Sequence, residues 1–133
     1  MAVLVDSSVL IDIERRRQSL DSLEAIANEE PIALAAISVS ELLVGVHRAE
    51  TEERARSRAA FVEDVVSRFT VISFDLATAR IYGQITAGLM SAGQTIGAHD
   101  VLIAATAIAH GYTVLTHNLR DFRRIPNLEV RQA

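Results

Sequence analysis

The stretch that decides the fold is Gly97-Ala98-His99-Asp100-Val101-Leu102-Ile103-Ala104-Ala105-Thr106-Ala107-Ile108-Ala109-His110-Gly111. Between Val101 and Ala109 every residue except Thr106 is apolar, so a helix here has no polar face and is expected to be buried on most sides. Gly111 favours the end of a helix, where the left-handed conformation is common. Asp100 is the one acid of this segment. At the first turn of a helix, free N–H groups and the helix dipole stabilise a carboxylate, so capping alone is one explanation of Asp100.

A short apolar segment, Tyr112 to Thr116, follows this helix and is typical of a buried strand. In a right-handed βαβ unit the helix runs antiparallel to the strands, so its N-terminus lies at the edge where the strands end. Asp100 opens the helix and Asp121 follows the strand. We therefore expect both acids at one edge of a sheet.

Two earlier segments repeat this order of strand and helix. Residues 2–5 form an apolar run that stops at Asp6, and residues 32–37 form a second run, followed by Ser38-Val39-Ser40-Glu41. Ser-x-x-Glu before an apolar run is typical of a capping box. We therefore predict Glu41 in the first turn of the next helix, at the same edge as Asp6 and Asp100; capping and catalysis do not exclude each other there.

The rest of the chain continues the alternation. An amphipathic pattern predicts a helix over residues 51–69, Asp75 is expected to cap a helix that reaches Ser91, and residues 128–130 can form a last edge strand. We predict a single domain over residues 1–133, built as a three-layer α/β/α sandwich around a central, mostly parallel sheet of about five strands. Ligands of such folds bind at the C-terminal edge of the strands.

The composition excludes several classes of chemistry. The chain has no cysteine and no lysine, and all 13 basic residues are arginine, so thiolate zinc sites, cysteine nucleophiles and Schiff bases are excluded. The net charge of −4 argues against passive nucleic-acid binding through a broad basic face but not against a nuclease. Without a membrane-spanning run or a signal peptide pattern, we expect a soluble cytoplasmic protein.

Four acids are predicted at one edge of the sheet: Asp6, Glu41, Asp100 and Asp121. Carboxylates drawn together raise each other's pKa unless a cation compensates their charge. Hard oxygen ligands without a histidine or cysteine pattern suit Mg²⁺ or Mn²⁺. Such an ion activates water and neutralises charge on a phosphate, so the residues indicate a metal-dependent phosphoryl hydrolase.

Four motifs, in this order, resemble the PIN domain. They are Val5-Asp6-Ser7-Ser8, Ser38-x-x-Glu41, Ile96-Gly97-Ala98-His99-Asp100 and Thr116-His117-Asn118-Leu119-Arg120-Asp121-Phe122. The length of the chain and the order of these motifs are similar to those of VapC, the ribonuclease toxin family of toxin-antitoxin pairs. The resemblance spans Val3 to Phe122. It implies Mg²⁺-dependent or Mn²⁺-dependent endonucleolytic cleavage of RNA, often of a tRNA or rRNA, by a homodimer. It also implies a VapB-like antitoxin whose tail fills the active-site groove.

The resemblance assigns roles to individual residues. Asp6 and Asp100 correspond to the main metal ligands, Glu41 to a ligand or the group that orients the attacking water, and Asp121 to the fourth catalytic acid. Some relatives carry an acid at the position of Asn118, so Asn118 and Asp121 stay alternatives for the fourth contact to the metal.

Two hydroxyl residues are accessory candidates at the same edge. The resemblance implies that the hydroxyls of Ser8 and Thr116 can contact a metal-bound water or a phosphate, although a helix cap and a strand-end hydrogen bond explain the two residues equally well.

Six arginines lie near the ends of the elements that form the acidic edge. Guanidinium groups match phosphate geometry, so we predict that some of them guide RNA, with ordinary surface charge as the alternative. They are Arg15, Arg16, Arg17, Arg120, Arg123 and Arg124.

Other classes of protein fit this sequence less well. A Ser-His-Asp hydrolase is disfavoured because the chain has no Gly-x-Ser-x-Gly motif and because His99 and Asp100, adjacent on a helix, do not face one another. A haloacid-dehalogenase-type phosphatase needs a second aspartate two residues after Asp6, where Ser8 stands. The main alternative is a non-catalytic PIN-like module that binds RNA or a protein partner, and the presence of all four acids favours the enzyme.

Overall fold

The computed structural model describes residues 2–133. Five short strands form one sheet in the order β3-β2-β1-β4-β5, and every neighbouring pair is parallel. The predicted α/β architecture with a parallel sheet of five strands is confirmed. In chain order the elements are β1 (Val3–Val5), α1 (Ser7–Arg15), α2 (Asp21–Ile26), β2 (Ile32–Ala35), α3 (Ala36–His47), α4 (Glu52–Arg68), β3 (Thr70–Ile72), α5 (Leu76–Ser91), α6 (Ala98–His110), β4 (Thr113–Thr116), α7 (Leu119–Phe122) and β5 (Val130–Gln132).

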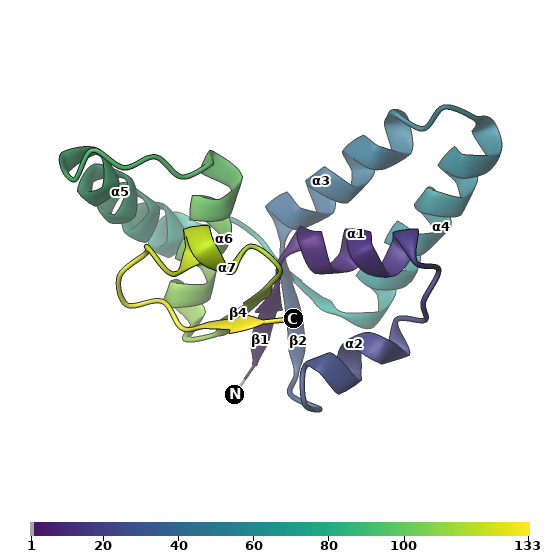
Figure 1. Cartoon of the computed structure of the whole chain (residues 1–133), viewed down its shortest axis with the longest axis horizontal. Coiled ribbons are helices and arrows are strands. Elements are labelled where there is room, and N and C mark those ends of the chain that lie inside the picture. Colours follow the sequence, from purple (N-terminus) through teal and green to yellow (C-terminus); the bar gives the residue numbers. More distant parts are fainter. Residues whose placement is uncertain (1) are drawn as a thin grey trace.

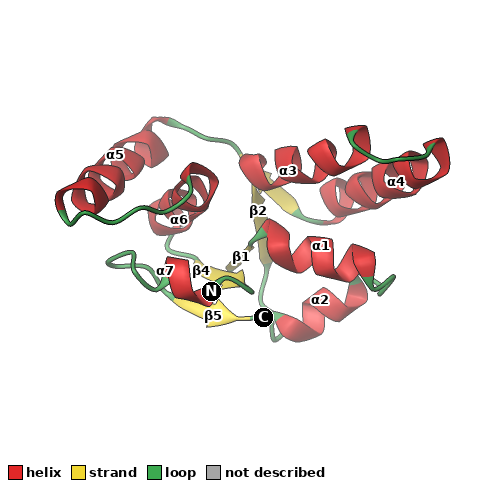
Figure 2. Cartoon of the chain, turned by 45° about the horizontal axis from the view of Figure 1, so that its top comes forward, coloured by secondary structure: helices red, strands yellow, loops and turns green. Residues whose placement is uncertain are grey.

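Helices cover both faces of the sheet. α1, α2 and α4 lie on one side of the strands, and α5 and α6 lie on the other (Figures 1 and 2). Successive residues of a strand point to opposite faces, so Val3 and Val5 pack into the core beneath α1 and α4, whereas Leu4 packs into the core beneath α6. Within residues 2–133, no helix combines the length and the apolar character that crossing a bilayer requires.

The central helix of the prediction is α6. Its buried face includes Val101 and all five residues from Ile103 to Ala107, and Gly111 ends the helix with a φ of 70°. The positive φ confirms the left-handed helix end that the sequence predicts at Gly111. α6 runs antiparallel to the strands (Figure 1). Its first turn, which contains Asp100, therefore lies at the edge where β1 and β4 end.

The predicted capping box at Ser38 is wrong. β2 ends at Ala35 and α3 begins at Ala36 without a loop, so Ser38 is the third residue of the helix and Glu41 the sixth. Ser38 is fully buried, and its Oγ makes no hydrogen bond to any described residue. Glu41 therefore lies in the second turn of α3 rather than in the first.

Other boundaries agree more closely with the sequence. Asp75 caps α5 by accepting a 2.9 Å hydrogen bond from the backbone N–H of Thr78. β5 starts at Val130, two residues later than the predicted strand. The short helix α7, which carries Asp121, was not predicted.

Candidate active site

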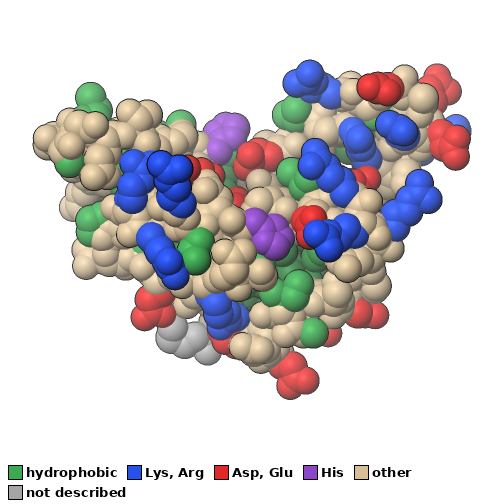
Figure 3. All heavy atoms as spheres, in the orientation of Figure 1, with side chains coloured by type: hydrophobic (Ala, Val, Ile, Leu, Met, Phe, Trp, Pro, Cys, Tyr) green, Lys and Arg blue, Asp and Glu red, His purple; other side chains and the backbone are tan. Residues whose placement is uncertain are grey.

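The four predicted acids lie where the strands end. Asp6 directly follows β1, Asp100 lies in the first turn of α6, Glu41 projects from α3 and Asp121 from α7. In the space-filling view, acidic side chains lie in the notch between the two halves of the molecule (Figure 3).

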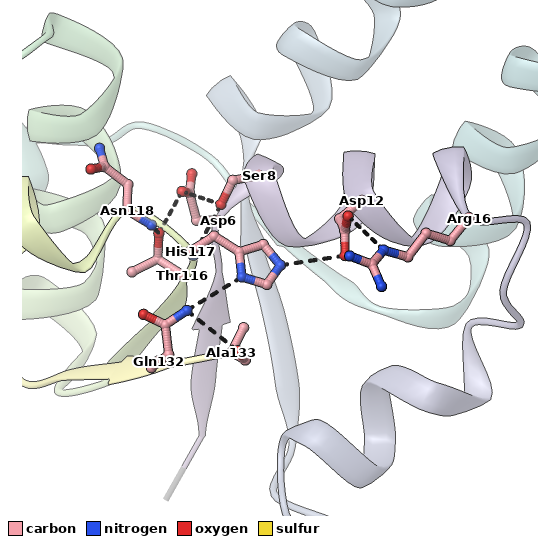
Figure 4. Close-up of polar contacts among 9 residues, drawn as sticks. All are labelled: Asp6, Ser8, Asp12, Arg16, Thr116, His117, Asn118, Gln132 and Ala133. Carbon is pink, nitrogen blue, oxygen red and sulfur yellow. Dashed lines mark hydrogen bonds and ion pairs between the residues drawn. The ribbon is translucent and has the colours of Figure 1, made fainter.

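Asp6 is held by two hydroxyl groups. The side chain is 3% exposed, and its Oδ2 accepts hydrogen bonds from Ser8 Oγ at 2.9 Å and from Thr116 Oγ1 at 2.8 Å (Figure 4). Thr116 is fully buried and also accepts a 2.8 Å bond from the backbone N–H of Asn118. Two donors contact Oδ2, whereas the one donor that residues 2–133 offer to Oδ1 is Ser7 Oγ, at 3.5 Å. Ser8 and Thr116 therefore orient Asp6, and Ser8 does not cap the helix.

Asn118 connects the other two aspartates. Its side-chain Nδ2 donates to Asp100 Oδ2 and to Asp121 Oδ2, both at 3.2 Å. Asp121 also receives a 2.9 Å bond from the guanidinium of Arg124. Asn118 and Asp121 thus occupy the same site, with the amide between the two carboxylates.

The electrostatic environments of Asp100 and Asp121 differ. Burial, and then the charges of Asp6, Glu41 and Asp121, raise the pKa of Asp100 to about 6 against the weaker opposing effect of the Asn118 amide. Hydrogen bonds from Asn118 and Arg124 instead lower the pKa of Asp121. The guanidinium of Arg124 therefore compensates the charge of Asp121, whereas neighbouring carboxylates oppose the charge of Asp100.

Glu41 is linked to the cluster by a residue that the sequence reasoning missed. Ser7 Oγ donates a 3.1 Å hydrogen bond to Glu41 Oε1, and Ser7 is 5% exposed. On the other side, His99 Nδ1 lies 3.7 Å from Glu41 Oε2. The only signal in the sequence was the position of Ser7 immediately after Asp6.

The donor set suits a hard divalent cation. Within residues 2–133, no three acidic or histidine side chains converge closely enough to enclose an ion as they stand. Mg²⁺, however, commonly takes one or two protein carboxylates and keeps several waters. Asp6, whose Oδ1 has a long 3.5 Å contact from Ser7 Oγ, and Asp100, with its raised pKa, supply that pair, so the residues fit Mg²⁺ or Mn²⁺.

The six predicted arginines differ in their surroundings. Arg16 pairs with Asp12 at 3.0 Å, and Arg124 bonds Asp121 and the Thr95 carbonyl. Arg15, Arg17, Arg120 and Arg123 are exposed and form no ion pair within the described chain. Arg120 and Arg123 lie in and beside α7, the helix that carries Asp121.

A Ser-His-Asp hydrolase site is not assembled in the described part of the chain. The ring of His99 faces Glu41, and the ring of His117 lies 3.6 Å from Asp12 and 3.4 Å from Gln132 (Figure 4). His117 contacts Ser8 through its backbone N–H, not through the ring.

Comparison with known proteins places this site in a family. The sequence profile of the PIN domain matches residues 3–128. Ribonuclease VapC of Rickettsia bellii is 40% identical over 130 residues, which span 98% of this chain and 95% of the relative. The chain belongs to the VapC family of PIN-domain proteins. The resemblance inferred from the four motifs is confirmed.

Two further VapC proteins agree with this assignment. The tRNA(fMet)-specific endonuclease VapC of Salmonella typhimurium is 35% identical over 103 residues, which span 77% of this chain and 76% of the relative. The crystal structure of VapBC2 from Rickettsia felis, bound to a DNA fragment from its promoter, contains a chain that superposes with a TM-score of 0.89 at 27% identity. That superposition covers 100% of this VapC-family chain and 99% of the other.

Proposed function

We propose that this chain is a Mg²⁺-dependent or Mn²⁺-dependent endoribonuclease and the toxin of a toxin-antitoxin pair. The observation that carries this proposal is Asp100, whose half-buried carboxylate faces three further acids and whose pKa is raised to about 6. Such an arrangement is unfavourable unless a cation compensates it. Membership in the VapC family, whose relatives are named ribonucleases, supports RNA as the substrate.

Three of the four acids have a direct role in the proposed reaction. Asp6 and Asp100 would hold the cation, which when bound supplies charge stabilisation to the phosphate and activates water. Glu41 orients the attacking water, because its carboxylate faces the cluster from α3. Ser8 and Thr116 fix the direction of Asp6, and Asn118 fixes Asp100 relative to Asp121.

The substrate class follows from the family and from the surface charge. A relative named as a tRNA(fMet)-specific endonuclease supports a structured RNA such as a tRNA or rRNA. Arg120 and Arg123 are exposed on the rim beside Asp121 and would contact RNA phosphates. Arg16 and Arg124, already paired with Asp12 and Asp121, are less available for that role.

A groove between α1, α3 and α4 is the proposed site of a VapB-like antitoxin. Its apolar lining is Ile11, Leu42, Phe61 and Val62, and its charged lining includes Glu14, Arg15 and Arg58. The groove reaches Glu41, so a segment with apolar side chains seated in it would end at the acids. A structural neighbour described as a VapBC complex supports a partner of this type.

A second copy of the chain is the proposed partner of another apolar surface. Phe74 and Leu76 are 54% and 67% exposed, beside a hollow lined in part by Ile37, Ile72 and Leu102. Burial of this surface would stabilise the expected homodimer. Light scattering that detects only monomer at micromolar concentration would contradict it.

Expression in a bacterial host tests the proposed function. We expect the unmodified chain to stop growth and to leave discrete RNA fragments, and Asp6→Ala, expressed at the same level, to do neither. If Asp6→Ala is as toxic as the unmodified chain, cleavage at this site is not the function, and a module that binds RNA or protein without cutting becomes the better account.

A further inference from the structure

Glu41 differs from the other acids in how it reaches the site. It projects from the second turn of α3, whereas Asp6 follows β1 directly. A glutamate side chain has one more rotatable bond than an aspartate, and the charge of Asp100 opposes the approach of Glu41. Glu41 therefore needs an anchor to stay with the other acids.

Two side chains of the described chain lie near the Glu41 carboxylate, and one of them is within hydrogen-bonding distance. Ser7 Oγ lies 3.1 Å from Glu41 Oε1, which is within hydrogen-bonding distance. His99 Nδ1 lies 3.7 Å from Oε2, beyond that distance, and the His99 side chain is 56% exposed. Ser7 is 5% exposed, and its short side chain loses little freedom when it is fixed at the start of α1.

Ser7 Oγ lies near two carboxylates, those of Asp6 and Glu41, and the distances favour a hydrogen bond to Glu41. A hydroxyl group has one hydrogen to donate. Glu41 Oε1 lies at 3.1 Å, whereas Asp6 Oδ1 lies at 3.5 Å. Asp6 already accepts bonds from Ser8 and Thr116, so it does not depend on Ser7.

We propose that Ser7 is a positioning residue that holds Glu41 among the acids of the site. Ser8 and Thr116 orient Asp6, Asn118 orients Asp100, and Ser7 orients Glu41. The role of Ser7 in cleavage rests on the proposed function, but its effect on the position of Glu41 does not.

Single-turnover cleavage of RNA and crystal structures of the same variants test this role. Ser7→Ala is expected to lower the cleavage rate constant about 10- to 100-fold, with the dissociation constant for RNA unchanged, because the water-orienting group is misplaced. Ser7→Thr retains the hydroxyl and is expected to restore most of the rate. The matched control is Ser67→Ala, since Ser67 is exposed on α4 and its hydroxyl donates to the Asp64 carbonyl of the same helix, away from the acids. This variant should cleave RNA at the unmodified rate.

The crystal structure of Ser7→Ala supplies a readout that does not depend on activity. We expect the Glu41 carboxylate to leave its position, while Asp6 stays bonded to Ser8 and Thr116. A Glu41 carboxylate that stays in place, or an unchanged cleavage rate constant, would overturn the proposal. If the unmodified chain cleaves no RNA, the proposed function fails, and the crystal structures still decide whether Ser7 holds Glu41.

Discussion

Thr116 Oγ1 donates a 2.8 Å hydrogen bond to Asp6 Oδ2 across a sequence separation of 110 residues. The bond joins the C-terminal ends of β1 and β4, which are neighbours in the sheet. Thr116 also accepts a bond from the Asn118 backbone, so this hydroxyl connects the turn that carries Asn118 to the acid at the centre of the site.

Removal of this hydroxyl should weaken both the fold and the site. Thr116→Val keeps the volume of the side chain but leaves the backbone N–H of Asn118 without its acceptor and Asp6 with one donor fewer. We expect the free energy of unfolding, measured by urea denaturation, to fall by about 1 to 3 kcal/mol. Thr116→Ser, which keeps the hydroxyl, should lose much less. Equal stability of the valine and serine variants would show that the hydrogen bond is not responsible.

Ionisation of Asp100 should lower the stability of the folded chain, whereas ionisation of most carboxylates raises it. Its pKa rises from an ordinary 3.8 to about 6 in the folded chain, so between these values the folded state binds more protons than the unfolded state. Preferential protonation of Asp100 in the folded state therefore stabilises the chain. This stabilisation is complete below about pH 4 and is lost as the pH rises through about 6.

Asp100→Asn isolates that contribution, because asparagine carries no charge. In the presence of a chelator, thermal unfolding near neutral pH should show the variant to be more stable than the unmodified chain, and the difference should vanish near pH 4. The same difference at both pH values would mean that repulsion at Asp100 is not its cause.

Asp100 and Asp121 should contribute unequally to cation binding. Arg124 and Asn118 already compensate Asp121, whereas Asp100 has only the amide. In calorimetric titrations with Mn²⁺, we expect Asp100→Asn to abolish binding and Asp121→Asn to weaken it less than about 10-fold, since a screened charge contributes less. The reverse order would make Asp121 the main ligand, and Asn118→Ala tests the amide in the same assay.

Arg120 and Arg123 should account for part of the salt dependence of RNA binding. The double variant Arg120→Ala/Arg123→Ala is expected to weaken RNA binding and to reduce the slope of log K against log salt by about 0.7 for each phosphate that is no longer neutralised. Arg54→Ala/Arg56→Ala removes the same charge from exposed positions on α4 and should leave the slope nearly unchanged. Equal slopes for the two double variants would remove Arg120 and Arg123 from the RNA-binding surface.

The sequence predicts the fold and the meeting of the four acids because both follow from simple rules of topology. Alternating strands and helices indicate a parallel sheet, and in such a sheet residues that follow strands or open helices lie at one edge. That argument alone predicts that Asp6 and Asp100 lie together, and the structure brings them together.

The contacts within the site depend on details that such rules do not include. The Ser38-Glu41 pattern predicted a helix start, but α3 begins at Ala36, and a helix turns by about 100° per residue, so its start decides which side chains face the site. The pairing of Ser7 with Glu41 follows from that start. α7, with four residues, is too short for a periodic pattern to reveal.

Cleavage of RNA by the purified chain tests the central claim most directly. Total RNA would be incubated with the antitoxin-free chain in Mg²⁺ or Mn²⁺, beside a sample with excess chelator and a sample of folded Asp100→Asn. We predict discrete fragments with the unmodified chain and either metal, and none in the two controls. Fragments that persist in the chelator or with Asp100→Asn, or no fragments from the folded unmodified chain in either metal, would contradict a cation-dependent ribonuclease site at these four acids.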